Sequence, residues 1–493
     1  METPSEGAMA SPPEEGRGAS SRLVGESLVY IASRALPSGI TLVTGMWLTW
    51  FLHPEAYGLY GLGTALVNVA SSAFFGWHAL SFMRFYQSNT ENPKFMPTIA
   101  QTFVLLCALT GLTAVAAGVS GWLDRDYQTL IWICVPGCWF FSWFELSARV
   151  QVARFRPVSY FWMNVARNVG ILVFCITLAW LTRSPLAVLA GSFVAMLLSA
   201  VLFNAGGFDL RPRLFDGAAA RQLLIFGGPL AVVQILTASS FATDRFLLDA
   251  FSGKASVGFY TVAYSLAQTT ISTIGAGIDS AIYSRAVRAA DAKDPAALQG
   301  QLTRNCILLL ALLLPAAVGA ALVAPALARL FVGPEYVGPV TALISWMAFA
   351  ALILSFRANY VDHAFHFGNS TTRLTVVIAT MVVVNVVADL ALIPQFGAVG
   401  AAMASIVAGT IGLVHGLIAS RSVLRLPFPP REIAKIVAAT AAMALFLWPL
   451  YGTSSLWGLA LQVIGGAVVF GVVVVATDLM AVRKLVVARL RRA

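Results

Sequence analysis

Residues 51–66 read FLHPEAYGLYGLGTAL, and residues 251–266 read FSGKASVGFYTVAYSL, so the chain makes nearly the same turn twice. A weaker echo pairs AVLAGSFVA, from residue 187, with AVGAAMASI, from residue 398. Both similarities indicate two copies of one structural unit in the same orientation. At an offset of 200, the identical positions are Phe51 and Phe251, Gly58 and Gly258, Tyr60 and Tyr260, and Leu66 and Leu266.

The composition around these repeats is that of an integral membrane protein. The chain has 493 residues, of which 58% are hydrophobic and only 11% are charged, and its mean hydropathy is +0.80. A soluble fold of this size does not hide so much apolar surface. Several apolar runs exceed the roughly 20 residues that a helix needs to cross a bilayer, and they do not alternate as membrane strands would. We therefore expect an all-α polytopic membrane protein.

Pro, Gly and charged residues divide the apolar runs into fourteen predicted spans. If spans 1–6 and 7–12 are the two repeats, they form two pseudo-symmetric six-helix bundles at 23–215 and 216–425, followed by two additional helices at 426–482. Residues 1–22 are expected to form a disordered cytoplasmic tail and residues 483–493 a basic one. The predicted spans are 27–51, 57–82, 97–118, 128–147, 158–181, 185–207, 223–243, 257–282, 305–331, 337–365, 374–392, 398–420, 433–450 and 456–481.

Lys and Arg alternate in number from one predicted turn to the next. Retained loops carry the positive charge, so this alternation places both termini in the cytoplasm. An excess of Lys and Arg on one side of the membrane accounts for the net charge of +10, so no nucleic-acid-binding surface is needed to explain it. The Lys and Arg expected on the external side are Arg125, Arg183, Arg245, Lys254 and Arg329.

Four stretches resemble the polysaccharide transporter (Wzx-type flippase) family of the multidrug/oligosaccharidyl-lipid/polysaccharide (MOP) flippase superfamily. They read PEAYGLYGLGTALVNVASSAFF from residue 54, FGGPLAVVQILTASSFATDRFLLDAFSGKASVGFYTVAYSLAQ from 226, LVAPALARLFVGPEYVGPVTALISWMAF from 322 and VVADLALIPQFGAVGAAMASIVAG from 386. The resemblance implies two V-shaped bundles, an alternating-access cavity and a cargo of undecaprenyl-diphosphate-linked glycan, which is flipped to the periplasmic leaflet for surface polysaccharide assembly. It also implies the bacterial inner membrane, with a polysaccharide polymerase and chain-length proteins as possible partners.

Three arginines lie inside predicted spans, where a charge costs several kcal/mol unless it is paired or hydrated. Arg34, Arg167 and Arg357 all fall in the cytoplasmic half of their spans. A guanidinium stays charged and forks onto phosphate oxygens, so we expect these arginines to capture the diphosphate, unless they only snorkel or pair structurally. Asn164 and Asn359 are candidate sugar contacts beside them.

Several other residues are candidates for gating or ion coupling. Pro37 removes a backbone donor next to Arg34, which predicts a bend in span 1. Asp244 and Arg245, at the predicted outer end of span 7, are expected to form an external gate contact or only an interfacial pair. Asp389, near the outer end of span 11, joins Asp244 as a candidate carboxylate for coupling to H⁺ or Na⁺.

Two other classes of function remain to be weighed. A cation-coupled multidrug exporter of the MATE type shares the two-bundle plan, but central carboxylates and about twelve spans would be typical of it. A membrane enzyme is disfavoured because no loop is long enough for a catalytic domain, and no metal site or cofactor is expected.

Glu145 and Arg149, four residues apart in span 4, are expected to form an intrahelical pair.

Overall fold

The computed structural model describes residues 36–119, 124–203, 211, 214–292, 294–368 and 370–479. The described residues form helices and short connections, with no strand among them. After a first helix, Leu36–Leu48, the elements are α2 (Pro54–Ser71), η1 (Ser72–Gly76), α3 (Trp77–Phe85), η2 (Gln87–Asn89), α4 (Phe95–Val119), α5 (Arg125–Ala153), α6 (Pro157–Thr182), α7 (Pro185–Phe203), α8 (Gly217–Asp291), α9 (Pro295–Phe331), η4 (Pro334–Tyr336), α10 (Val337–Phe356), η5 (Arg357–Val361), α11 (Asp362–Phe367), α12 (Thr371–Ser420), α13 (Pro430–Leu447), η6 (Trp448–Leu450) and α14 (Leu456–Ala476).

This order of helices confirms the predicted all-α polytopic fold. Within the described residues, eleven helices are long and apolar enough to cross a membrane. Two of them contain a π-helical turn, η1 in the span Pro54–Phe85 and η5 in the span Pro334–Phe367. Two elements, α8 and α12, each hold two predicted spans that are joined without a loop, and each contains a single non-helical residue where it reverses.

The two reversals occur at glycines in conformations that L side chains rarely adopt. Gly253 has φ 79° and ψ 168°, and Gly397 has φ 55° and ψ −133°. The predicted end of span 7 at residue 243 was wrong, because the helix continues to Gly253 without a loop. Asp244 and Arg245 therefore lie inside the membrane-spanning helix, and Arg245 does not belong to an external turn as expected.

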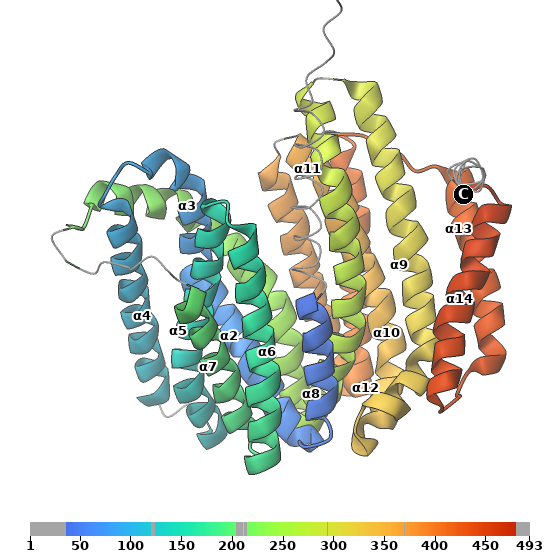
Figure 1. Ribbon diagram of the computed structural model, residues 1–493, viewed down its shortest axis with the longest axis horizontal. Coiled ribbons are helices and arrows are strands. Elements are labelled where there is room, and N and C mark those ends of the chain that lie inside the picture. Colours follow the sequence, from blue (N-terminus) through green and yellow to red (C-terminus); the bar gives the residue numbers. More distant parts are fainter. Residues whose placement is uncertain are drawn as a thin grey trace, which may run out of the picture.

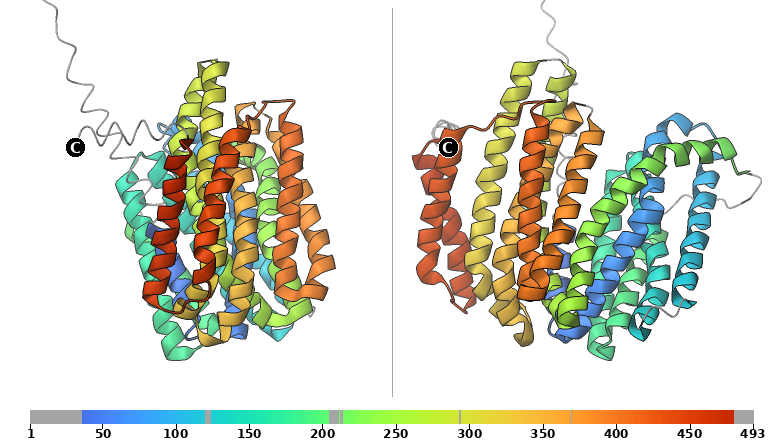
Figure 2. Two further views of the ribbon diagram at one scale, coloured as in Figure 1. Left: turned by 90° about the vertical axis from the view of Figure 1, so that its right-hand side faces the viewer. Right: turned by 180° about the vertical axis from the view of Figure 1, so that it is seen from behind.

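The helices form two lobes that lean apart in a V (Figure 1). One lobe contains α2–α7 and the other contains α9–α14, while the helix Leu36–Leu48 and parts of α8 lie between them. The view from behind shows the same arrangement, with the lobes meeting at one end and separating toward the other (Figure 2). The last two spans, α13 and α14, pack against α9 on the far side of the second lobe.

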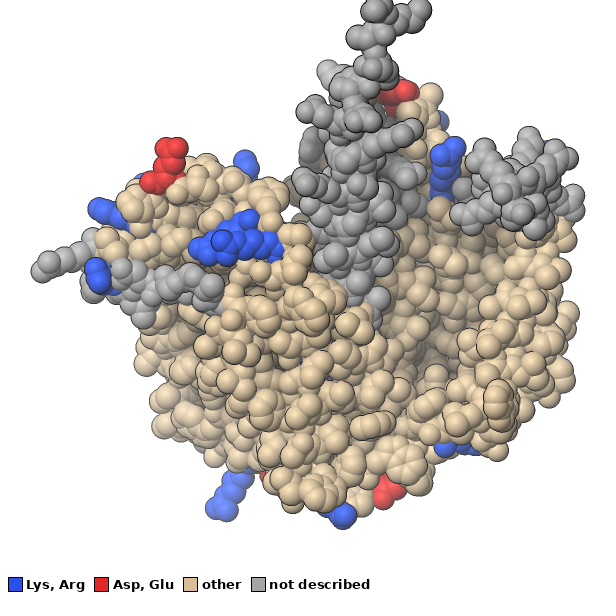
Figure 3. Space-filling model, in the orientation of Figure 1, with Lys and Arg blue, Asp and Glu red and all other residues tan. Residues whose placement is uncertain are grey.

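Charged residues gather at the two ends of the molecule and leave an apolar band between them. On the face in Figure 3, blue and red atoms lie near the ends, and the middle is tan. We call the end where the lobes separate the arginine-rich end, because its turns carry Arg84, Lys94, Arg154, Arg156, Arg373, Arg421, Arg425 and Arg431. The end where the lobes meet, the opposite end, holds the reversals at Gly253 and Gly397.

Polar contacts join the lobes at the opposite end. Asp126 of α5 forms an ion pair with Lys254 of α8, and the Tyr127 hydroxyl donates to Asp249 of α8. At the same end, the backbone N–H of Gly333 donates to Thr49 Oγ1 at 2.8 Å. Buried tyrosines reinforce this end, where the Tyr336 hydroxyl donates to the carbonyl of Leu52 at 2.8 Å. These contacts seal the end at which the lobes meet.

Candidate functional site

The described residues line a polar cavity of about 360 Å³ within the second half of the chain. Its walls come from α8, α10, η5 and α12, so residues more than 150 positions apart converge on it. The lining of this cavity contains both charged and amide side chains, whereas a hydrophobic core is lined by apolar ones. The polar lining residues are Thr237, Asp244, Tyr264, Gln268, Ser272, Ser355, Arg357, Asn359, Asn385 and Ser405.

Arg357 enters this cavity from the π-helical turn η5. Its Nη1 pairs with Asp362 Oδ1 at 3.1 Å, and both side chains are largely buried. In a regular α-helix, residues five apart diverge by about 140°. The wider π turn brings Asp362 onto the same side as Arg357, and such turns frequently occur at functional sites. Arg357 Nε is buried without a hydrogen-bond partner among the described residues, so one edge of the guanidinium is free.

Two carboxyl groups meet beside this cavity, and one of them, Asp244, lines it. Asp244 of α8 and Asp389 of α12 lie within hydrogen-bonding reach of each other, and Asp389 is fully buried. The Tyr260 hydroxyl donates to Asp244 Oδ2 at 2.5 Å, and Ser405 Oγ donates to the same oxygen at 3.4 Å. Asp244 Oδ1, both oxygens of Asp389 and the amide nitrogen of Asn385 have no other partner within the described chain.

This carboxyl pair has the chemistry of a cation site. Two like charges in contact repel strongly when water is excluded, so a bound proton or monovalent cation stabilises the pair. Oxygen ligands of this kind suit hard cations. No group of three or more His, Cys, Asp or Glu that could hold a metal ion occurs in the part of the chain that the structure describes.

Arg245, the residue after Asp244, lines a different cavity. This second cavity has a volume of about 210 Å³ and lies between α2 and α8, where Thr64 and Asn68 form its other polar walls. The Arg245 guanidinium carbon is 5.1 Å from the centre of the Tyr264 ring, close enough for a cation–π contact. Arg245 is buried rather than external, so consecutive residues of α8 serve cavities on two sides of the helix.

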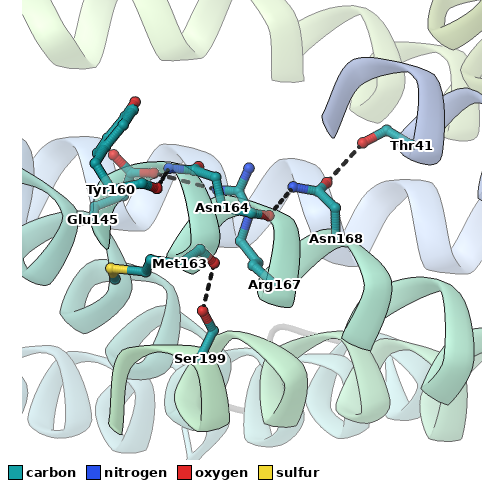
Figure 4. A network of polar contacts seen from close by, with 8 residues as sticks. All are labelled: Thr41, Glu145, Tyr160, Met163, Asn164, Arg167, Asn168 and Ser199. Atoms are coloured by element: carbon teal, nitrogen blue, oxygen red, sulfur yellow. Dashed lines mark hydrogen bonds and ion pairs between the residues drawn. The ribbon is translucent and has the colours of Figure 1, made fainter. Parts of the chain in front are cut away.

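A separate polar network lies in the first lobe, centred on α6 (Figure 4). Asn164 Nδ2 donates to the Tyr160 carbonyl at 2.9 Å, and Asn168 Nδ2 donates to the Asn164 carbonyl at 2.8 Å. The Thr41 hydroxyl donates to Asn168 Oδ1 at 3.0 Å and so connects the first helix to α6. Asn164 therefore lies in a structural chain of contacts as well as in a candidate sugar-binding region.

Arg167 sits beside this network and is paired within its own lobe. Its Nη1 is 3.7 Å from Glu145 Oε1 of α5, and its guanidinium carbon lies 4.5 Å from the centre of the Phe144 ring. The expected pair of Glu145 with Arg149 is wrong, because Glu145 contacts Arg167 instead. Arg167 Nε is buried without a partner among the described residues, which repeats the pattern of Arg357.

The structure brings together some of the predicted site residues and separates others. Asp244, Arg357 and Asn359 line one cavity, and Asp389 contacts Asp244. Asn164 and Arg167 are absent from the described lining of that cavity. Arg34 lies outside the described residues, as do both predicted tails. Pro37 is buried near the start of the first described helix, and the predicted bend beside Arg34 falls where that description begins.

Three partners that complete the site were not predicted from the sequence. Asp362 was not identified because its pairing with Arg357 depends on the π turn, which leaves no obvious mark in the sequence. Tyr260 was noticed only as a repeated residue, yet it donates to Asp244. Ser405 was interpreted only as a small residue at a helix contact, yet its hydroxyl donates to Asp244.

The fold and the buried polar cavity define a polytopic membrane protein built from two helical lobes. A family model described as "Polysaccharide biosynthesis protein" matches residues 47–341, and the chain belongs to this family. The family and the fold point to a transporter rather than an enzyme.

Three known proteins are similar to the chain in sequence or in fold. It is 23% identical over 436 residues to the probable flippase AglR of Haloferax volcanii, covering 85% of this chain and 89% of the relative. The fold is similar to the lipid II flippase MurJ in an inward closed conformation, with a TM-score of 0.75, 14% identity and coverage of 93% of this chain and 99% of that one. An inward-facing MATE family transporter of the MOP superfamily gives a TM-score of 0.60 at 13% identity, covering 80% and 98%. The predicted resemblance is confirmed.

Proposed function

We propose that the chain is a flippase that moves a polyprenyl-diphosphate-linked oligosaccharide from the cytoplasmic to the periplasmic leaflet by alternating access. The name of the family and the similarity to two proteins named as flippases support this proposal. In this proposal the cargo crosses without chemical conversion, for assembly into a surface polysaccharide such as O-antigen, capsule or exopolysaccharide.

One observation carries the choice of an anionic cargo. Arg357 lies in the wall of the cavity of about 360 Å³, and its Nε is unpartnered among the described residues. Asp362 pairs with its Nη1. A half-satisfied, buried guanidinium favours an additional acceptor, and phosphate oxygens match its geometry. Arg167 offers the same arrangement in the first lobe, so each half of the chain supplies one candidate for the diphosphate.

The arrangement of the lobes supports the direction of entry. The opposite end is sealed by contacts such as Asp126 with Lys254, and the lobes separate toward the arginine-rich end. By the positive-inside rule the arginine-rich end faces the cytoplasm, so the structure corresponds to a state that accepts cargo from that side. Both termini are then cytoplasmic, the membrane is the bacterial inner membrane, and a polymerase and chain-length proteins are candidate partners on the far side.

Reconstituted vesicles test the proposal directly. The purified chain is placed in vesicles containing a labelled polyprenyl-diphosphate disaccharide, and a membrane-impermeant glycosidase reports how much glycan reaches the outer face. We expect faster exposure than in empty vesicles and a strong loss in Arg357→Gln. Arg304→Gln, at an exposed arginine of α9 that is absent from the cavity lining, is the matched control. Equal exposure of the glycan in vesicles with and without the protein would overturn the flippase proposal.

We further infer that a cation bound at Asp244 and Asp389 drives the cycle. The buried carboxyl pair, with Tyr260 and Ser405 on Asp244, supports H⁺ or Na⁺ as the coupling ion. Central carboxylates are also the feature that favours the MATE-type exporter as a second candidate function. Vesicles loaded with a fluorescent organic cation distinguish the two, because an exporter would move the dye and leave the glycan in place.

A further inference from the structure

A third cavity, of about 540 Å³, lies at the arginine-rich end beyond the last turn of α12. It is formed by the end of α12 and by the connection to α13, residues 421–429, and it is separate from the cavity that contains Arg357. Its described lining contains two arginines and no carboxylate. The lining residues are Leu417, Ser420, Arg421, Arg425, Leu426 and Phe428.

The connection that forms this cavity is held in place by contacts to two helical segments, η5 and α9. The Tyr360 hydroxyl of η5 donates to the Pro427 carbonyl at 2.5 Å, and the ring of Phe428 lies edge-on to that of Tyr360 with centres 5.6 Å apart. Gln299 of α9 donates to the carbonyl of Arg425 at 2.9 Å. These contacts use backbone atoms and the Phe428 ring, so the side chains of Arg421 and Arg425, both exposed, take no part in them.

An apolar stripe on α12 leads up to the cavity. Val407, Ile411, Val414 and Ile418 share one face of the helix and are 40–59% exposed. Arg421 follows Ile418 by three residues, so the stripe ends where the positive charge begins. Ile418 lies eleven residues beyond Val407, which corresponds to about 16 Å along the helix. This length corresponds to one leaflet of a hydrocarbon core roughly 30 Å thick, and so to a single acyl chain.

We propose that this cavity binds an anionic phospholipid of the leaflet at the arginine-rich end. The phosphate lies between Arg421 and Arg425, and one acyl chain follows the stripe on α12. Basic pockets between membrane helices on this side bind anionic headgroups, and guanidinium groups suit phosphate oxygens. The stripe matches an acyl chain better than a polyprenyl chain, which is several times longer.

Native mass spectrometry of the purified full chain, titrated with phosphatidylglycerol or phosphatidylcholine, tests the proposal. We expect the wild type to prefer phosphatidylglycerol, and Arg421→Gln with Arg425→Gln to bind it roughly 30-fold more weakly. Each single variant is expected to lose about fivefold, which keeps the test informative if the double variant does not fold. Arg431→Gln removes an exposed arginine that is absent from the cavity lining, and it is expected to bind like the wild type.

Four outcomes would overturn the proposal. Undiminished binding by the Arg421 and Arg425 variants would remove the site, and an equal loss in Arg431→Gln would reduce it to general surface charge. A prenyl diphosphate that displaces phosphatidylglycerol, with the same dependence on Arg421 and Arg425, would instead make this cavity an entry site for the cargo. Inorganic pyrophosphate is included as a competitor, because equal competition by it would indicate a soluble anion rather than a lipid.

Discussion

Gly58 and Gly258, equivalent residues of the internal repeat, lie against each other where α2 meets α8. A β-carbon on Gly58 would lie 1.9 Å from the Lys254 carbonyl oxygen, and one on Gly258 would lie 2.2 Å from the Pro54 carbonyl oxygen. Pro54 and Lys254 are also separated by 200 residues, so the contact is two-fold symmetric, like an isologous interface between subunits. Close approach of the backbones here requires glycine on both sides, and it forms part of the seal at the opposite end.

Gly58→Ala is expected to loosen that seal. The added methyl group meets backbone rather than a flexible side chain, and overpacking of this kind costs about 1–3 kcal/mol. The closed population should fall roughly tenfold or more. Cross-linking between cysteines at positions 126 and 254, whose native side chains form an ion pair, measures the effect.

Gly338→Ala is the control for this experiment, because a β-carbon there has nothing within 4 Å. We expect its cross-linking yield to equal that of the parent. If Gly58→Ala cross-links as efficiently as Gly338→Ala, the glycine contact does not hold the end closed.

Arg357→Lys is expected to retain the fold but impair transport. Lysine keeps a positive charge next to Asp362, whereas it cannot offer the forked donors that a phosphate requires. Loss of one charge-assisted hydrogen bond, about 1.5–3 kcal/mol, predicts a flipping rate lower by roughly tenfold or more. The rate is measured in the vesicle assay, with the melting temperature in detergent as a check of folding. Full transport by the lysine variant would contradict the forked contact.

Asp389→Asn is expected to abolish the response of transport to a cation gradient. Asparagine has nearly the same shape as aspartate, but it lacks the negative charge with which Asp389, together with Asp244, would bind a cation. Flipping rates are compared with and without Na⁺ or proton gradients, and the variant should show the same rate in both. Glu432→Gln, which alters a carboxylate paired with Lys435 at the arginine-rich end, should respond like the wild type. A gradient response that persists in Asp389→Asn would exclude the carboxyl pair as the coupling site.

Gly397→Ala is expected to destabilise the protein by about 1–3 kcal/mol, because its backbone conformation is nearly exclusive to glycine. The nearest atom to an added β-carbon is Ser252 Oγ at 3.6 Å, an ordinary contact, so the cost comes from the backbone. Gly300→Ala, at an exposed position inside α9, should be neutral or stabilise by about 0.5–1 kcal/mol. Unfolding in detergent compares the two variants, and equal shifts would rule out the backbone explanation.

Side-chain pairing in the site could be predicted only in part. Asp244 and Asp389 were predicted as candidate coupling carboxylates near the outer ends of their spans, because a desolvated carboxylate can take up a proton. Their contact with each other was not predicted, since it depends on how α8 and α12 cross. Arg357 was identified because a charge inside an apolar run is costly, but its partner Asp362 became apparent only with the π turn. The burial of Arg245 was missed because nothing in the sequence distinguishes a reversal at Gly253 from a loop.

The sequence by itself determined the membrane class, the order of the helices and the repeat, because apolar length, charge asymmetry and turn chemistry are local properties. It also indicated that Arg167 and Arg357 lie within apolar helices. The tertiary structure alone decided that Gly58 meets Gly258, that Arg167 and Arg357 belong to separate polar networks, and that Arg421 and Arg425 share a cavity. These relationships depend on how helices far apart in the sequence pack, and packing is set by the complementary shapes of many side chains together rather than by any one stretch.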